Sequence, residues 1–328
     1  MRRLTGVFLL FLLWPIAGQT ANETANETAD ETAGETARGP AAALPSVVSL
    51  LPLWSGRPAN PEEPEGSAVV IGHDGDGTLL VTADHVLGDA VRFRIRTAEG
   101  VAYPALILGR DRPSDLALLR VQADLPALEF ASPPALGAKV CALGNAFGLG
   151  LSLTCGVLSA KGRAGVGFNR VEDFLQSDAA VNPGMSGGAL LDSDGRLIGL
   201  LSAIFTKGSD ADIGVNFSVS SALIQAALPD LASGGPVAWP HVDLLFRPPE
   251  VEAEGPLGPV VMRIPKGGAA AAADLQPKDR ILHANQRRIR NLGDWRSAIA
   301  LAQPGETITL EVWRSGAGET LSLVVPGQ

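Results

Sequence analysis

The chain is short of the residues that mark several classes of protein. Its 328 residues include 26 lysines and arginines against 35 aspartates and glutamates, a formal net charge of −9. Because no basic stripe is available to neutralise phosphates, a nucleic-acid-binding function is excluded. No apolar run reaches the roughly 20 residues that span a bilayer. The chain is nevertheless long enough for two globular domains, each with its own core.

Cysteine is scarce as well, with Cys141 and Cys155 as the two thiols of the chain. They flank a glycine-rich loop at residues 144–150, on segments predicted to be antiparallel strands. Antiparallel neighbours approach to about 5.5 Å between Cα atoms, and an oxidising compartment permits the bond. We therefore predict a disulfide, with two small buried thiols as the alternative.

The first 45 residues are predicted to precede the folded part. Two arginines, an apolar run at residues 7–17 and small residues after it are typical of a secretory signal peptide over residues 1–20. An uncleaved membrane anchor remains the alternative, because Gln19 and Thr20 make a poor cleavage site. Residues 21–36 repeat a four-residue unit with five acids and no large apolar residue, so residues 21–45 are expected to be a disordered linker. We expect a periplasmic or secreted protein, without strong membrane association once the signal is removed.

Short apolar segments separated by turns follow from residue 46 to residue 233. Many short strands with almost no helical periodicity predict an all-β barrel or sandwich. One helix is predicted at residues 221–231. The predicted strands are residues 46–51, 66–72, 78–82, 91–96, 102–108, 116–121, 138–143, 151–160, 189–191, 196–205 and 215–219.

A serine in a glycine-rich turn is the candidate nucleophile. Ser186 lies in residues 181–190, which read VNPGMSGGAL, and glycines allow the neighbouring N–H groups to converge on one point. Such a hydroxyl needs a base and an orienting carboxylate. Of the four histidines, only His85 directly follows a buried-looking strand, where a turn begins. Asp115 stands at the start of an apolar strand, where a partly desolvated carboxylate needs an N–H donor. A lone histidine there is more often structural, and Asp111 is interpreted as an ordinary turn residue.

Four spaced motifs carry a resemblance to a known family. Residues 82–86 read TADHV, residues 114–118 SDLAL, residues 144–149 GNAFGL and residues 182–188 NPGMSGG. In this order they resemble the HtrA/Deg serine proteases, over about residues 46–328. The resemblance implies a chymotrypsin-like protease domain at residues 46–233, with two β-barrels and the active site between them.

The resemblance also implies the site residues. His85 is expected to act as base and acid, Asp115 to orient it and Ser186 to attack, with the N–H groups of Gly184 and Ser186 as the oxyanion hole and without metal or cofactor. Asp84 departs from the family, which usually has an uncharged residue there, so it is expected to perturb His85 or to act as a decoy carboxylate. Met185 replaces a usual asparagine, a change that should be tolerated.

Residues 236–328 are predicted to form a separate unit that resembles a PDZ domain. Strands are expected at residues 260–264, 280–284, 307–312 and 320–325, with a helix at residues 292–302. A PDZ domain accepts a peptide as an extra strand beside that helix. In residues 239–244, Pro240 lacks an N–H group and Asp243 would repel a carboxylate, so weak capture of chain ends is predicted. An internal hydrophobic segment is the alternative ligand.

The predicted function is that of an extracytoplasmic, ATP-independent endopeptidase that degrades unfolded or misfolded proteins and binds hydrophobic peptides, with a homotrimer implied by the resemblance. A non-cleaving peptide-binding or chaperone module on a protease-like fold is the alternative. The acid-free run at residues 200–205, which includes Ala203, Ile204 and Phe205, is predicted to line the primary specificity pocket and to favour small aliphatic side chains.

Overall fold

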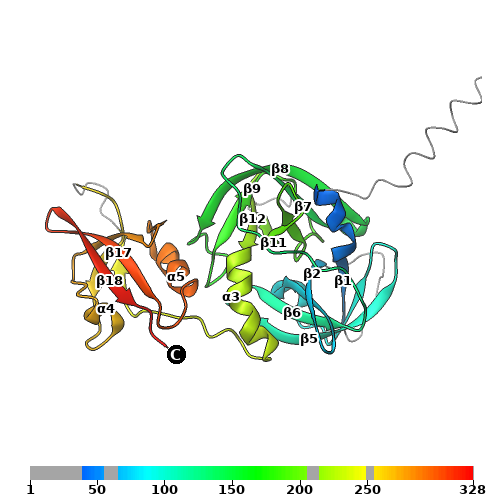
Figure 1. The fold of residues 1–328 in the computed structure, drawn as a ribbon, viewed down its shortest axis with the longest axis horizontal. Coiled ribbons are helices and arrows are strands. Elements are labelled where there is room, and N and C mark those ends of the chain that lie inside the picture. Colours follow the sequence, from blue (N-terminus) through cyan, green and yellow to red (C-terminus); the bar gives the residue numbers. More distant parts are fainter. Residues whose placement is uncertain (1–38, 55–65, 205–213, 249–254, 328) are drawn as a thin grey trace, which may run out of the picture. The chain divides into compact units, whose positions relative to one another are not determined.

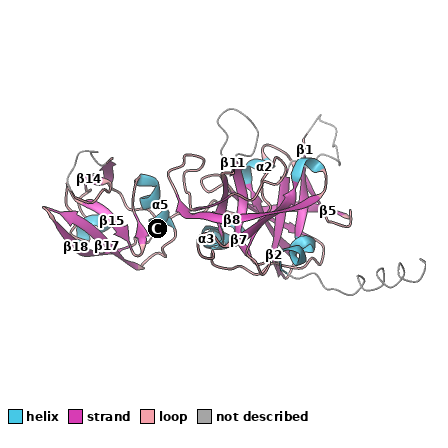
Figure 2. Ribbon diagram, turned by 90° about the horizontal axis from the view of Figure 1, so that it is seen from above, coloured by secondary structure: helices cyan, strands magenta, loops and turns pink. Residues whose placement is uncertain are grey.

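The computed structural model describes residues 39–54, 66–204, 214–248 and 255–327. The predicted signal peptide and the repeat at residues 21–36 lie outside these residues. None of the helices within them is long and apolar enough to cross a membrane. Strands are the main regular secondary structure of the described chain, and the helices are few and short (Figure 2).

The first six strands close into a barrel in the order β1-β2-β3-β6-β5-β4 (Figure 1). All neighbouring pairs are antiparallel. In β4, Phe93 and Ile95 face the barrel core while Arg92 and Arg94 are exposed, as the alternation of apolar and basic residues predicts. The strands are β1 (Val47–Leu53), β2 (Gly66–Asp74), β3 (Gly77–Ala83), β4 (Arg92–Arg96), β5 (Ala102–Asp111) and β6 (Leu116–Val121).

The next six strands close into a second barrel in the order β10-β11-β12-β9-β8-β7. The two closed barrels confirm the predicted chymotrypsin-like class. The strands are β7 (Lys139–Asn145), β8 (Leu151–Arg163), β9 (Phe174–Ser177), β10 (Ala189–Leu191), β11 (Leu197–Ile204) and β12 (Asn216–Ser220).

Successive residues of some strands are buried in different cores. In β1, Val47 belongs to the large cluster that includes residues of both barrels, whereas Val48 and Leu50 belong to the core of the first barrel. The same division separates Val69 from Val70 in β2. Burial on both faces explains why these strands read as continuous apolar runs rather than as alternating patterns.

Two further elements complete this part of the chain. Helix α3 (Ser221–Ala232) begins where the side chain of Ser220 accepts a hydrogen bond from the N–H of Leu223, a typical N-cap. A 3-10 helix, η1 (Gly39–Ser46), precedes β1, and its Ala43 is 1% exposed in the large core. The prediction that the disordered linker reaches residue 45 was therefore wrong for residues 39–45, since tertiary packing orders a segment whose composition alone does not.

The C-terminal residues form a third sheet with the path β13-β14-β15-β17-β18, and β16 pairs with β15. Trp295 and Ile299 of α5 (Leu292–Ala300) are buried in its core, as the predicted helical stripe requires. The side chain of Asn291 accepts from the N–H of Asp294 at 2.8 Å and starts the helix. The remaining elements are α4 (Ala269–Ala272), β13 (Leu245–Arg247), β14 (Val260–Arg263), β15 (Arg280–Ala284), β16 (Arg287–Arg288), β17 (Thr307–Arg314) and β18 (Ala317–Val324).

The segment between α3 and β13 is bonded to the first barrel. The N–H of Val237 and the indole N–H of Trp239 both donate to the carboxylate of Asp111 at the end of β5, at 3.1 and 2.9 Å. Val237 and Trp239, which the sequence assigns to the separate C-terminal unit, are thus fastened to the turn that precedes Asp115.

The two cysteines face each other across β7 and β8. Cys141 and Cys155 are register partners, their Cα atoms lie 4.0 Å apart, and their sulfur atoms are bonded. The bond closes a loop with a sequence separation of 14 residues.

Replacing both cysteines by serine should lower the free energy of unfolding. A loop of about 15 residues closed by a disulfide contributes about 3 kcal/mol in the chain-entropy account, because the bond restricts the unfolded chain. Denaturant unfolding of the wild type and of the Cys141→Ser, Cys155→Ser double variant measures the difference. Two thiols titrated in denatured, unreduced wild-type protein would contradict the bond itself.

Candidate functional site

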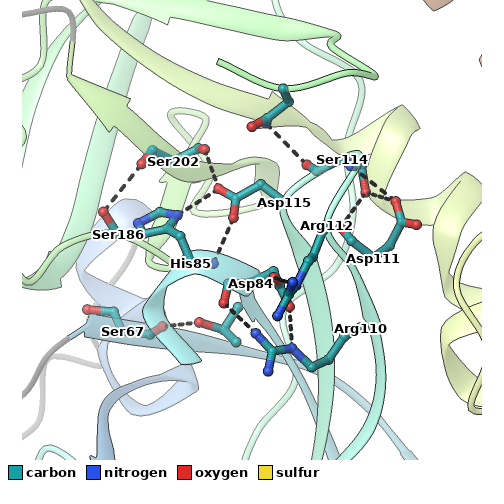
Figure 3. A network of polar contacts seen from close by, with 12 residues as sticks. Ser67, Asp84, His85, Arg110, Asp111, Arg112, Ser114, Asp115, Ser186 and Ser202 are labelled. Carbon is teal, nitrogen blue, oxygen red and sulfur yellow. Dashed lines mark hydrogen bonds and ion pairs between the residues drawn. The ribbon is translucent and has the colours of Figure 1, made fainter. Parts of the chain in front are cut away.

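Asp115 holds His85 at two points. Its Oδ2 lies 2.8 Å from the imidazole Nδ1, and its Oδ1 accepts from the backbone N–H of His85 at 2.8 Å (Figure 3). His85 stands on the short helix α2 (Asp84–Leu87), directly after β3. Asp115 is 8% exposed, and its carboxylate selects the tautomer with the proton on Nδ1. This leaves Nε2 as a proton acceptor.

Ser202 connects this pair to Ser186. The hydroxyl of Ser202 donates to Asp115 Oδ2 at 3.0 Å, and its carbonyl oxygen accepts from the hydroxyl of Ser186 at 3.3 Å (Figure 3). The structure therefore brings the three predicted residues into one network. The role of Ser202 was not predicted, although a serine within the otherwise apolar residues 197–204 is a signal that could have identified it.

The loop before β10 requires glycine at two positions. Gly184 has φ 91° and Gly187 has φ 81°, in the left-handed region that other residues seldom adopt. A Cβ atom on Gly187 would lie 2.2 Å from the carbonyl oxygen of Ser67, and one on Gly184 would lie 2.3 Å from the carbonyl oxygen of Asn145. Met185 between them is fully buried in the core of the second barrel, so its side chain anchors the loop without entering the site.

Two N–H groups of this loop have no hydrogen-bond acceptor among the described residues, those of Gly184 and Ser186. The other three in residues 184–188 donate to carbonyl oxygens. The carbonyl of Pro183 accepts from the N–H of Phe147 at 2.8 Å. Because the peptide unit is planar and trans, this bond turns the N–H of Gly184 the opposite way. The pair predicted as the oxyanion hole is thus free to bind an oxygen.

Ser67 of β2 fastens the loop to the first barrel. Its hydroxyl donates to the carbonyl of Gly184 at 2.8 Å and accepts from the N–H of Asn145 at 2.9 Å. Its own N–H donates to the carbonyl of Ser186 at 2.8 Å. Sequence analysis missed Ser67, since nothing in its local pattern distinguishes it from any small residue of a strand.

Asp84 is bonded to arginine, not to the imidazole. Its carboxylate forms an ion pair with Arg110 and lies 4.0 Å from Arg112. The prediction of a decoy carboxylate is therefore wrong, but the predicted perturbation of His85 stands. Burial lowers the pKa of His85, while the hydrogen bond and charge of Asp115 and the charge of Asp84 outweigh it and leave the pKa above 6.5.

The residues predicted to line the specificity pocket lie at the end of β11 and directly after it. Leu200 and Leu201 are fully buried in the cores, so the prediction that the whole run at residues 200–205 lines a pocket is wrong for these two. Ala203 and Ile204 belong to β11 and pair with Phe217 and Asn216 of β12. Phe205 lies outside the described residues.

The predicted peptide loop lines a cleft of about 540 Å³. Its walls include residues 239–244, the edge strand β13, and the side chains of Leu292 and Trp295 on α5. Leu292 is 38% exposed there, while Phe246 packs edge-on against Trp295 with ring centroids 5.6 Å apart. Among the described residues, the backbone N–H groups of residues 242–244 have no acceptor.

The arrangement has the parts that nucleophilic acyl transfer requires. They are a hydroxyl, an imidazole oriented by a carboxylate, and two N–H groups that have no acceptor among the described residues. Within the described residues no group of three histidine, cysteine or acidic side chains is placed to hold a metal ion.

Removing either nearby carboxylate should lower the pKa of His85. Asp115→Asn should have the larger effect, because it removes a charge that is hydrogen-bonded to the imidazole, and Asp84→Asn a smaller one, because the charge that it removes is not bonded to the imidazole. NMR titration of the imidazole in the wild type and both variants measures the order. A larger fall in Asp84→Asn than in Asp115→Asn would show that the orienting carboxylate is misassigned.

Two family models match the chain, a trypsin-like peptidase domain at residues 66–200 and a PDZ domain at residues 211–325. The "Probable periplasmic serine endoprotease DegP-like" of Chlamydia muridarum (strain MoPn / Nigg) is 36% identical over 269 residues, which cover 79% of this chain and 53% of that protein. The "Periplasmic serine endoprotease DegP" of Escherichia coli (strain K12) is 31% identical over 270 residues, which cover 79% and 56%. The chain thus spans about half the length of the curated relatives it matches.

Solved structures match over a larger share of their length. "HtrA-type protease AlgW with tripeptide" has a TM-score of 0.66 and 31% identity, covering 87% of this chain and 94% of that chain. "HtrA-type protease AlgW with decapeptide" has a TM-score of 0.64 and 29% identity, covering 87% and 96%. With both domain models present and these relatives matched almost throughout, the chain belongs to the HtrA-type serine proteases.

Proposed function

We propose that this protein is a serine endopeptidase in which Ser186 is the nucleophile, His85 the general base and acid, and Asp115 the orienting carboxylate. The observation that carries the proposal is the two-point contact between Asp115 and His85, joined through Ser202 to a serine whose loop holds two free N–H groups.

The hydroxyl of Ser186 attacks the carbonyl carbon of the scissile bond while His85 Nε2 takes its proton. The negative charge that develops on the carbonyl oxygen is stabilised by the N–H groups of Gly184 and Ser186. His85 then returns the proton to the leaving amine and the C–N bond breaks. Water, activated by the same imidazole, hydrolyses the ester and restores the hydroxyl.

Attack requires a small rearrangement of the nucleophile. The hydroxyl of Ser186 donates to the Ser202 carbonyl at 3.3 Å. A hydrogen bond of this length is weak, so the hydroxyl can leave it for another acceptor at little cost in free energy. Rotation about the Cα–Cβ bond of Ser186 redirects the hydroxyl towards His85 Nε2. Catalytic hydrogen bonds in substrate-free sites are often long and tighten when substrate binds.

The substrates are unfolded or misfolded protein chains in the periplasm, and the active form is a homotrimer. The names of the DegP-like relatives, which are periplasmic serine endoproteases, support the location and the reaction. An unfolded chain supplies the extended backbone that a protease groove and an edge strand such as β13 both need. Cleavage after small aliphatic residues is proposed from the acid-free sequence that includes Ala203, Ile204 and Phe205.

Replacing the nucleophile should abolish hydrolysis without unfolding the protein. Ser186→Ala should lose nearly all cleavage of unfolded casein, because loop geometry depends on Gly184 and Gly187 and not on the hydroxyl. Asp115→Asn should reduce kcat by about 10⁴-fold, since the imidazole loses its tautomer and orientation. Casein digestion followed by electrophoresis, with circular dichroism as the folding control, measures both effects.

The same assay separates a protease from a non-cleaving peptide-binding or chaperone module. If wild-type protein leaves casein intact after long incubation, with and without added C-terminal peptides, the proposal fails and the binding module is favoured. Retained cleavage in Ser186→Ala would instead assign the nucleophile elsewhere.

The cleft beside α5 should bind hydrophobic peptides with little dependence on a free carboxylate. The free N–H groups of residues 242–244 favour an anion there, but the charge of Asp243 opposes it. Calorimetric titration with one hydrophobic peptide, as free acid and as C-terminal amide, should give similar Kd values. Tight binding of the free acid but not of the amide would contradict the expectation that Asp243 weakens carboxylate binding. In that case Asp243→Gly should leave the Kd for the free acid unchanged.

A further inference from the structure

Asp111 is a fully buried carboxylate that the reaction does not use directly. It ends β5, four residues before Asp115, and its side chain is 0% exposed. Burial of a carboxylate is costly unless hydrogen bonds satisfy its oxygens. Among the described residues, no lysine or arginine forms an ion pair with it, so neutral donors must hold it.

Four donors from two separate segments converge on this carboxylate. Oδ2 accepts from the N–H of Ser114 at 3.1 Å, from its hydroxyl at 2.6 Å and from the indole N–H of Trp239 at 2.9 Å. Oδ1 accepts from the N–H of Val237 at 3.1 Å. Two donors thus belong to the turn before Asp115 (Figure 3), and two belong to the linker that follows α3.

The turn that Asp111 closes holds Asp115 in a demanding conformation. Asp115 has φ 59°, in the left-handed region that a residue with a side chain adopts only when its surroundings enforce it. Its N–H donates to the carbonyl of Arg112 at 3.3 Å and its carbonyl accepts from the N–H of Asp84 at 3.1 Å. The bonds from Ser114 to Asp111 fix the residue directly before it, and therefore the direction in which the Asp115 carboxylate leaves the turn.

We propose that Asp111 is a positioning residue for the Asp115 and His85 pair, and that Trp239 makes this positioning depend on the wall of the peptide cleft. Trp239 lines that cleft and directly precedes residues 240–244. A continuous path of hydrogen bonds and one peptide link therefore runs from the cleft wall through Asp111, Ser114 and Asp115 to His85.

The variants differ in which bonds they remove. Asp111→Ala removes all four acceptor contacts. Asp111→Asn can keep its oxygen on the side of Ser114 and Trp239 and loses mainly the contact with Val237. Trp239→Phe keeps an aromatic ring in place but removes one donor. Asp192→Asn is the matched control, because Asp192 is also a buried turn carboxylate, 4% exposed, that accepts the N–H groups of Asp194 and Arg196.

The expected result is a graded shift of His85. Displacement of Asp115 weakens its bond to the imidazole, so the pKa of His85 falls most in Asp111→Ala, less in Trp239→Phe and least in Asp111→Asn, with no change in Asp192→Asn. The acid limb of the kcat/KM profile moves to lower pH in the same order, and kcat/KM falls by up to about 10²-fold, the cost of a misplacement near 1 Å.

Two readouts keep this inference separate from the proposed function on which its kinetic part rests. The pKa of His85, assigned by the NMR signal lost in His85→Gln, requires no activity, so an inactive wild type would leave that test intact. If the melting temperature falls in the Asp111 and Trp239 variants while the pKa of His85 stays at its wild-type value, Asp111 is structural and the inference is overturned. If Asp111→Ala does not fold, the pKa of His85 in Trp239→Phe decides: a lower pKa than in the wild type supports the inference, and an unchanged pKa overturns it.

Discussion

The catalytic geometry depends on one carboxylate held in a low-dielectric position between two barrels. Asp115 accepts bonds from the backbone and imidazole of His85 and from the hydroxyl of Ser202. The two donors of His85 stand on α2 and the third on β11, and the barrels supply the rigidity that keeps them in place. Because a charged acceptor forms stronger and shorter bonds than a neutral one, one side chain fixes the imidazole and joins the two halves of the site.

The serine loop depends on backbone constraints of a different kind. Gly184 and Gly187 adopt positive φ angles next to backbone atoms that leave no room for a Cβ atom. Phe147 and Gly188 donate to the carbonyl groups of Pro183 and Met185, and because each peptide unit is planar and trans, these bonds turn the N–H groups of Gly184 and Ser186 the opposite way. These hydrogen bonds hold the backbone of the loop, while the hydroxyl of Ser186 is bonded to the carbonyl of Ser202.

The residues proposed to perform the chemistry were easier to predict than those that position them. His85, Asp115 and Ser186 stand in motifs whose turns and glycines have a local signature, and the alternation in β4 predicts its buried face directly. Ser67 and Ser202 lack such a signature because their partners are distant in sequence. Asp111 was read as a turn residue, which is half of its role, since its bonds to Val237 and Trp239 span more than 120 residues. The segment η1 was missed for the same reason, because only contact with the core orders it.

Ser186 is the proposed nucleophile, and covalent labelling measures whether its hydroxyl is activated. A fluorophosphonate reacts with an activated serine by forming an Oγ–P bond and releasing fluoride, and peptide mass spectrometry locates the adduct. The account predicts one adduct, on Ser186, that disappears in His85→Ala although the serine is still present. An unlabelled wild type, or an adduct on another serine, would contradict it.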